Sequence, residues 1–217
     1  MHEMVFVIDD DVSVREGVAE LVESLGFRVQ TYSSAEEFLQ NGPHPSGCMI
    51  LDVFMGGMTG LQLQNRLMKA KVHLPIIFLT GRGDIPMTVH ALKAGASHFL
   101  TKPVQEPELL TAVREALASA RLANEERAEL DHIHRRFQTL ALRERQVMAF
   151  VVSGCLNKQI AHEMGISERT VKLYRARVMQ KMAVQSLADL VKQGERIGIG
   201  DPRKSKHDQA QQSSTRG

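Results

Sequence analysis

Five polar residues stand at or just beyond the ends of short, mostly apolar runs in the first half of the 217-residue chain. The runs cover residues 4–8, 48–51, 76–79 and 98–100, and the polar residues are Asp9, Asp10, Asp52, Thr80 and Lys102. Runs this short and this apolar are typical of strands buried on both faces of a sheet. Ligand sites in parallel sheets lie beyond the carboxyl ends of the strands, so we expect these five side chains to meet at one edge.

Three carboxylates beside a lysine and a hydroxyl have a definite chemical use. The carboxylates repel one another unless a cation neutralises them, and oxygen ligands with a phosphate partner favour Mg²⁺. The charge of Lys102 and the hydroxyl of Thr80 would stabilise phosphoryl oxygens. These residue types therefore suit transfer of a phosphoryl group to an aspartate.

The elements that must position these residues alternate between strands and helices. A further strand is expected over 27–32, and apolar residues at helical spacing follow the strands. Ser13 and Glu16 have the spacing of a capping box, which predicts the start of the first helix. Five such units in about 120 residues predict a parallel sheet with helices on both faces, the flavodoxin-like (βα)5 fold of the α/β class.

The charge of the chain is divided unevenly. Residues 1–120 hold 9 Lys and Arg against 14 Asp and Glu, whereas residues 140–200 hold 10 against 5. This asymmetry predicts two domains with different partners, the basic one being the candidate for nucleic acid. We expect domains over 1–120 and 140–200, a helical linker over 121–139 and a disordered tail over 201–217. The linker prediction rests on the absence of Gly and Pro from 108–138.

The basic second domain is expected to be all-α, with four helices over 143–153, 157–164, 168–181 and 186–193. Gly165 lies in a short turn, and Ser167 can cap the helix that follows. That helix carries an apolar stripe, which consists of Val171, Tyr174, Val178 and Met182. A helix, a short turn and a basic amphipathic helix are the layout of a helix-turn-helix, whose second helix enters the major groove of DNA.

Residues 4–118 resemble the receiver domain of two-component response regulators. The matching segments are 7–11, 51–55 with 57–60, 79–81 and 102–103. The resemblance implies that a sensor histidine kinase phosphorylates Asp52, and that Thr80 and Lys102 contact the phosphoryl group. It also implies an Mg²⁺ site formed by Asp9, Asp10, Asp52 and the backbone carbonyl of Phe54, with Phe99 as the switch aromatic.

One residue departs from the receiver pattern. The family usually has proline after the methionine that corresponds to Met55, and this chain has Gly56. Glycine leaves the backbone freer than proline does. We therefore expect the rigidity of this loop, and the lifetime of the phosphate, to be atypical.

Segments 142–148, 157–161, 165–172 and 177–182 look like the LuxR-type helix-turn-helix, so the whole chain is similar to the NarL/FixJ class of response regulators. The resemblance implies that Lys172, Leu173 and Ala176 face base edges, while Thr170, Arg175 and Arg177 lie near phosphates. It implies a phosphorylation-dependent transcriptional regulator that binds double-stranded promoter DNA as a homodimer, with RNA polymerase as a further candidate partner. Ala141 replaces the usual Ser or Thr before the first helix and removes a cap.

Composition and two alternatives complete the sequence evidence. No apolar run approaches the ~20 residues of a membrane span, and the two cysteines are far apart, so we expect a cytoplasmic protein without membrane partners. One alternative is an aspartyl-phosphate phosphatase of the haloacid dehalogenase type. Such enzymes need a second Asp two residues after the nucleophile, where this chain has Phe54. The other alternative is an adaptor whose helical domain binds protein or RNA.

Overall fold

The structure, a computed structural model, describes residues 4–41, 47–81, 89 and 91–200. The chain forms two compact units, Met1–Glu125 (unit 1) and Glu126–Gly217 (unit 2). Helix α5 (Glu106–Gln138) contributes residues to both, so 121–138 are helical, as predicted. The domain boundaries at 120 and 140 stay predictions, and the tail expected over 201–217 lies outside the described residues. No helix in the described ranges is long and apolar enough to cross a membrane.

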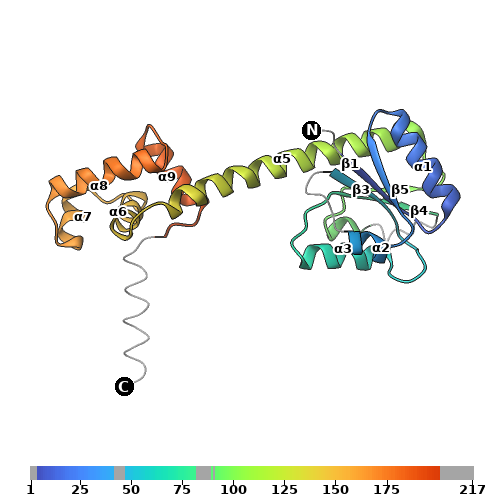
Figure 1. The fold of residues 1–217 in the computed structure, drawn as a ribbon, viewed down its shortest axis with the longest axis horizontal. Coiled ribbons are helices and arrows are strands. Elements are labelled where there is room, and N and C mark those ends of the chain that lie inside the picture. Colours follow the sequence, from blue (N-terminus) through green and yellow to red (C-terminus); the bar gives the residue numbers. More distant parts are fainter. Residues whose placement is uncertain (1–3, 42–46, 82–88, 90, 201–217) are drawn as a thin grey trace, which may run out of the picture. The chain divides into compact units, whose positions relative to one another are not determined.

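Unit 1 is built on a five-stranded parallel sheet (Figure 1). Its strands lie in the order β2-β1-β3-β4-β5, which confirms the flavodoxin-like prediction. The bounds are β1 Met4–Ile8, β2 Arg28–Tyr32, β3 Gly47–Asp52, β4 Ile76–Thr80 and β5 His98–Thr101. The three central strands are almost wholly buried, which explains their unbroken apolar runs.

Helices cover both faces of this sheet (Figure 1). On one face, α1 (Val12–Ser24) and the first part of α5 enclose a core that includes Val5, Ile50 and Ile77. On the other, α2 (Ala35–Asn41) and α3 (Gly60–Lys69) cover Phe6 and Phe78. Successive side chains of a strand point to opposite faces, so each central strand supplies both cores. Buried on both sides, the strand ends are firmly placed.

One local feature of unit 1 differs from the sequence prediction. Helix α1 is capped by Asp11, not by Ser13, because Asp11 Oδ1 accepts hydrogen bonds from Ser13 N at 2.9 Å and Val14 N at 3.2 Å. Asp52 and Thr80 are the last residues of β3 and β4, at the strand ends that the sequence predicts. Strand pairing therefore fixes the backbone at both residues.

Unit 2 contains α6 (Leu142–Val152), α7 (Asn157–Met164), α8 (Glu168–Lys181) and α9 (Leu187–Arg196). Gly165 ends α7 in the left-handed conformation with a φ of 65°, which glycine adopts without strain. The Ser167 hydroxyl caps α8 by accepting a hydrogen bond from Thr170 N at 3.1 Å. The predicted stripe of α8 faces the core, with Val171, Val178 and Met182 buried and Tyr174 partly buried.

Ala141 gives α6 no side-chain cap, and only the reciprocal half of a capping box is present. Glu144 Oε2 accepts a hydrogen bond from Ala141 N at 2.8 Å, and Lys181 Nζ lies 2.6 Å from the same oxygen. The Lys181 hydrogen bond, followed by the Ala141 hydrogen bond, lowers the pKa of Glu144 below its ordinary value of 4.5. One buried carboxylate thus joins the start of α6 to the end of α8.

We expect Glu144→Gln to destabilise unit 2 by about 1–3 kcal/mol at pH 7, because it removes a charge-assisted hydrogen bond. A lowered pKa stabilises the fold above the ordinary value, and this contribution is lost as pH falls through the folded pKa. The difference in unfolding free energy between the parent and Glu144→Gln should therefore shrink below about pH 4.5. Calorimetric unfolding of the whole chain measures it, with the exposed Glu163→Gln as control. An undiminished gap at acidic pH would contradict the assignment.

Candidate functional site

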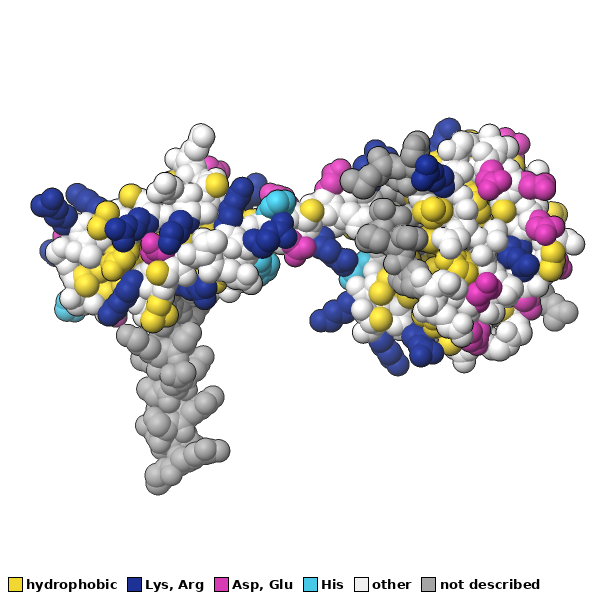
Figure 2. All heavy atoms as spheres, in the orientation of Figure 1, with side chains coloured by type: hydrophobic (Ala, Val, Ile, Leu, Met, Phe, Trp, Pro, Cys, Tyr) yellow, Lys and Arg dark blue, Asp and Glu magenta, His cyan; other side chains and the backbone are white. Residues whose placement is uncertain are grey.

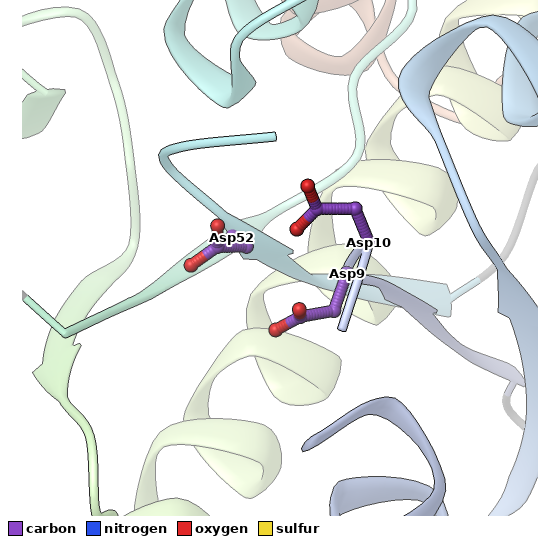
Figure 3. A group of neighbouring side chains, drawn as sticks. All are labelled: Asp9, Asp10 and Asp52. Carbon is purple, nitrogen blue, oxygen red and sulfur yellow. The ribbon is translucent and has the colours of Figure 1, made fainter. Parts of the chain in front are cut away.

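Three carboxylates meet where β1 and β3 end (Figure 3). Asp9 and Asp10 follow β1, and Asp52 closes β3, which pairs in register with β1. One oxygen from each carboxylate lies within 4.8 Å of those of the other two. Asp9 and Asp52 are buried, whereas Asp10 is exposed. The sheet therefore brings together three residues that are up to 43 positions apart, as the strand-end pattern predicts.

Lys102 places a positive charge between the two buried carboxylates. Its Nζ lies 2.6 Å from Asp9 Oδ2 and 2.9 Å from Asp52 Oδ1. The lysine follows β5 at the edge of the sheet, and its backbone N–H donates to Thr80 O at 2.8 Å. Lys102 is thus tied by its backbone to β4 and by its side chain to β1 and β3.

The acid–base properties of Asp52 and Lys102 reflect this arrangement. Burial raises the pKa of the Asp52 carboxyl above its ordinary value; Lys102 opposes this shift, and the neighbouring Asp9 adds to it. Burial lowers the pKa of the Lys102 ammonium, but the hydrogen bonds with Asp9 and Asp52 more than offset it, so the pKa is raised. Lys102 accordingly stays protonated beside the carboxylates.

Three further predicted site residues lie around this group. Thr80 is fully buried at the end of β4. Phe54 is 51% exposed, and its backbone N–H donates to Asp52 Oδ2 at 3.0 Å. Phe99 is partly buried on β5, with its ring centroid 6.1 Å from that of Phe78. The carbonyl of Phe54 as a metal ligand and the switch role of Phe99 stay predictions.

An open cleft of about 460 Å³ leads to the carboxylates. It is lined by Asp9, Asp10, Asp11, Val14, Asp52, Phe54, Gly81 and Lys102. Its carboxylate oxygens are hard metal ligands, and one of the carboxylates is the exposed Asp10. A site with few carboxylates and open space for water suits Mg²⁺, which keeps part of its hydration shell when it binds. The donor set therefore fits the expected cation.

The second candidate site is the outer face of α8 in unit 2. Lys172, Leu173, Ala176 and Arg177 are exposed, opposite the buried stripe, while Thr170 and Arg175 are partly buried. Lys and Arg side chains gather over this unit, with hydrophobic ones between them (Figure 2). The four exposed residues of the predicted set thus lie on the face of α8 that points away from the core, and Thr170 and Arg175 flank that face.

Two contacts on α8 could not be seen in the sequence. Arg175 Nη1 donates to Asn157 Oδ1 at 2.8 Å and so joins α8 to the first residue of α7. The Thr170 and Ser167 hydroxyls are 2.9 Å apart. Arg175 is therefore held in place by α7, which reduces its freedom to reach a phosphate but fixes its direction.

A flavodoxin-like sheet with an acidic, lysine-containing cleft, together with a separate helix-turn-helix unit, is the combination found in response regulators. Residues 5–114 match the family described as response regulator receiver domain, and residues 138–193 match the luxR family of bacterial regulatory proteins. The chain belongs to the response regulators that combine these two domains.

Named relatives agree with this membership. Nodulation protein W of Bradyrhizobium diazoefficiens is 45% identical over 90% of this chain and 87% of its own. Response regulator protein TmoT of Ectopseudomonas mendocina is 46% identical over 89% of each chain. The solved structure of response regulator StyR is 45% identical, with a TM-score of 0.79 over 90% of this chain and all of that one. Because the relatives are transcriptional regulators with a DNA-binding domain, they argue against the aspartyl-phosphate phosphatase alternative.

The raised pKa of Asp52 has a consequence for stability. A carboxyl whose folded pKa exceeds its ordinary value of 3.8 destabilises the fold when ionised. In metal-free buffer at pH 7, Asp52→Asn should therefore raise the unfolding temperature of unit 1. The difference should vanish as pH falls below the ordinary value.

Calorimetry between about pH 3 and about pH 8 checks this prediction, because that range includes the ordinary carboxyl pKa of 3.8. Adding Mg²⁺ should stabilise the parent protein more than the variant, because the variant has one carboxylate fewer. A variant that is less stable than the parent at pH 7 without metal would refute the direction of the shift.

Proposed function

We propose that this chain is a transcription regulator switched by phosphorylation of Asp52, with a sensor histidine kinase as the phosphoryl donor. The observation that carries the proposal is the position of Lys102, whose Nζ lies within hydrogen-bonding distance of both Asp9 and Asp52 in an open acidic cleft. A buried carboxylate beside a fixed cation can act as a nucleophile whose product charge is already offset.

The phosphoryl group is transferred to Asp52 in a single displacement. A carboxylate oxygen of Asp52 forms the bond to phosphorus, the phosphorus–nitrogen bond of the kinase phosphohistidine breaks, and the imidazole leaves with that electron pair. Lys102 then pairs with the phosphoryl oxygens, and the Thr80 hydroxyl donates a hydrogen bond to them. Asp9, Asp10, Asp52 and the Phe54 carbonyl would hold Mg²⁺, which when bound neutralises charge on the phosphoryl oxygens.

Phosphorylation then acts on DNA binding through association. The phosphorylated receiver, with Thr80 and Phe99 rearranged, favours a homodimer, and two copies of α8 meet the two half-sites of an operator. Lys172, Leu173 and Ala176 face base edges, whereas Thr170, Arg175 and Arg177 lie near phosphates. DNA affinity rises only by the free energy with which the phosphate favours the dimer.

The remaining partners follow from the same proposal. A regulator that binds promoter DNA would act in the cytoplasm, and RNA polymerase is the machinery that it would affect. The LuxR-type domain and the basic face of α8 support duplex DNA over the protein or RNA ligand of an adaptor.

Selection from a random duplex library, with and without beryllofluoride plus Mg²⁺, tests the proposal. We expect one two-part sequence motif, enriched mainly when the phosphoryl mimic is present, and no effect of the mimic on Asp52→Asn. Equal enrichment in both conditions would support sequence-specific DNA binding but contradict its control by phosphorylation. Failure to select any duplex would instead favour the adaptor.

Substitution of Lys172 tests the assignment of base contacts on α8. Lys172→Ala should weaken binding to the selected operator by about 1–3 kcal/mol and relax the preference at one base position. A phosphate contact would instead weaken all sequences alike and reduce the salt dependence. Binding isotherms over a salt series measure both effects. Lys69→Ala, an exposed lysine of α3 in the other unit, is the charge control.

A further inference from the structure

The loop between β3 and α3 directs three alternate backbone amides at three carboxylates. Phe54 N donates to Asp52 Oδ2 at 3.0 Å, and Gly56 N donates to Asp10 Oδ2 at 2.9 Å. Met58 N donates to Glu36 Oε1 on α2, also at 3.0 Å. Two of these three carboxylates belong to the acidic group at the end of the sheet. The loop is therefore joined to that group at two points.

In the part of the chain that the structure describes, the Gly56 contact matters most for Asp10. Asp9 and Asp52 are buried and share Lys102, whereas Asp10 is exposed. Among the described residues, the hydrogen bond from Gly56 is the one that the Asp10 side chain makes. It links positions 46 residues apart, so the direction of the Asp10 carboxylate depends on the conformation of this loop.

Neither backbone conformation nor space requires glycine at position 56. The left-handed φ of +95° belongs to the next residue, Gly57, and not to Gly56. A Cβ at position 56 would lie 3.8 Å from Asp10 Oδ2, an ordinary van der Waals contact. What position 56 does supply is an N–H, and the proline usual in the family has none. This chain can therefore make a bond that a chain with proline there cannot.

We propose that the Gly56 N–H is a positioning group for the metal site, which holds the Asp10 carboxylate beside Asp9 and Asp52 before Mg²⁺ binds. A carboxylate oriented in advance loses less rotational freedom when it becomes a ligand. Hydrogen bonds to ligating carboxylates contribute to metal affinity in the same way. The inference rests on the proposed function only in taking these carboxylates as the Mg²⁺ ligands.

A matched pair of variants separates the N–H from the side chain. Gly56→Ala keeps the N–H and adds a methyl group that fits, whereas Gly56→Pro removes the N–H. We expect Mg²⁺ affinity close to that of the parent for the alanine variant, and roughly 10-fold weaker for the proline variant. Titration of the whole chain with MgCl₂, followed by amide NMR shifts, measures the affinities without phosphorylation. A proline variant that binds as tightly as the parent would overturn the proposal, as would an equally weakened alanine variant.

Amide exchange in the parent decides the question if the proline variant does not fold. A positioning bond persists when the metal binds, so exchange of the Gly56 amide should stay slow, or become slower, as Mg²⁺ is added. Faster exchange would mean that the metal pulls Asp10 away from the loop, which would overturn the proposal. Asp10→Ala should accelerate the Gly56 amide and leave that of Met58, which is bound to Glu36, unchanged.

These outcomes distinguish the inference from the proposed function. Absence of Mg²⁺ binding by the parent would remove the metal site, and both claims with it. Normal binding by the parent, with equal affinities in both variants, would remove only the role of Gly56. A response of DNA binding to beryllofluoride would in that case still stand.

Discussion

Repulsion among three carboxylates is the constraint on which the site depends. Their oxygens lie within 4.8 Å of one another, and two of the three side chains are buried. Such a group can exist in a folded protein only where a rigid frame holds the carboxylates together and positive charge offsets their repulsion. The buried strands β1 and β3 are the frame, and Lys102 offsets Asp9 and Asp52. Asp10 faces solvent with a backbone amide as partner, so the group retains negative charge for a cation to neutralise.

The sequence was sufficient to place these groups because strand ends converge in any parallel sheet. Asp9, Asp52 and Lys102 could be assigned to one edge from their positions after apolar runs alone. The sequence also assigned Asp10 to this edge, but it did not identify Asp11 as the cap of α1. Asp11 became the cap because its oxygen reaches Ser13 N and Val14 N, a choice that depends on the backbone turn after β1.

Unit 2 shows the same limit at longer range. The helices and the stripe of α8 follow from periodicity, and the loss of the cap at Ala141 follows from the resemblance to the LuxR-type domain. The contact of Glu144 with Lys181, 37 positions away, follows from neither, because only packing of α6 against α8 brings them together. Arg175 is likewise held by Asn157 across the turn. Helix α8 is thus held near its middle by α7 and at its last residue by α6, through contacts that its own periodicity does not reveal.

Lys102 also connects Asp52 to the edge of the sheet. The lysine's backbone N–H is bonded to Thr80 O, and Thr80 pairs with Thr101 across β4 and β5. Two residues before Thr101, Phe99 pairs with Phe78, and their ring centroids are 6.1 Å apart. The acidic group is therefore joined to the β4–β5 pairing through the backbone of the same lysine whose side chain offsets Asp9 and Asp52.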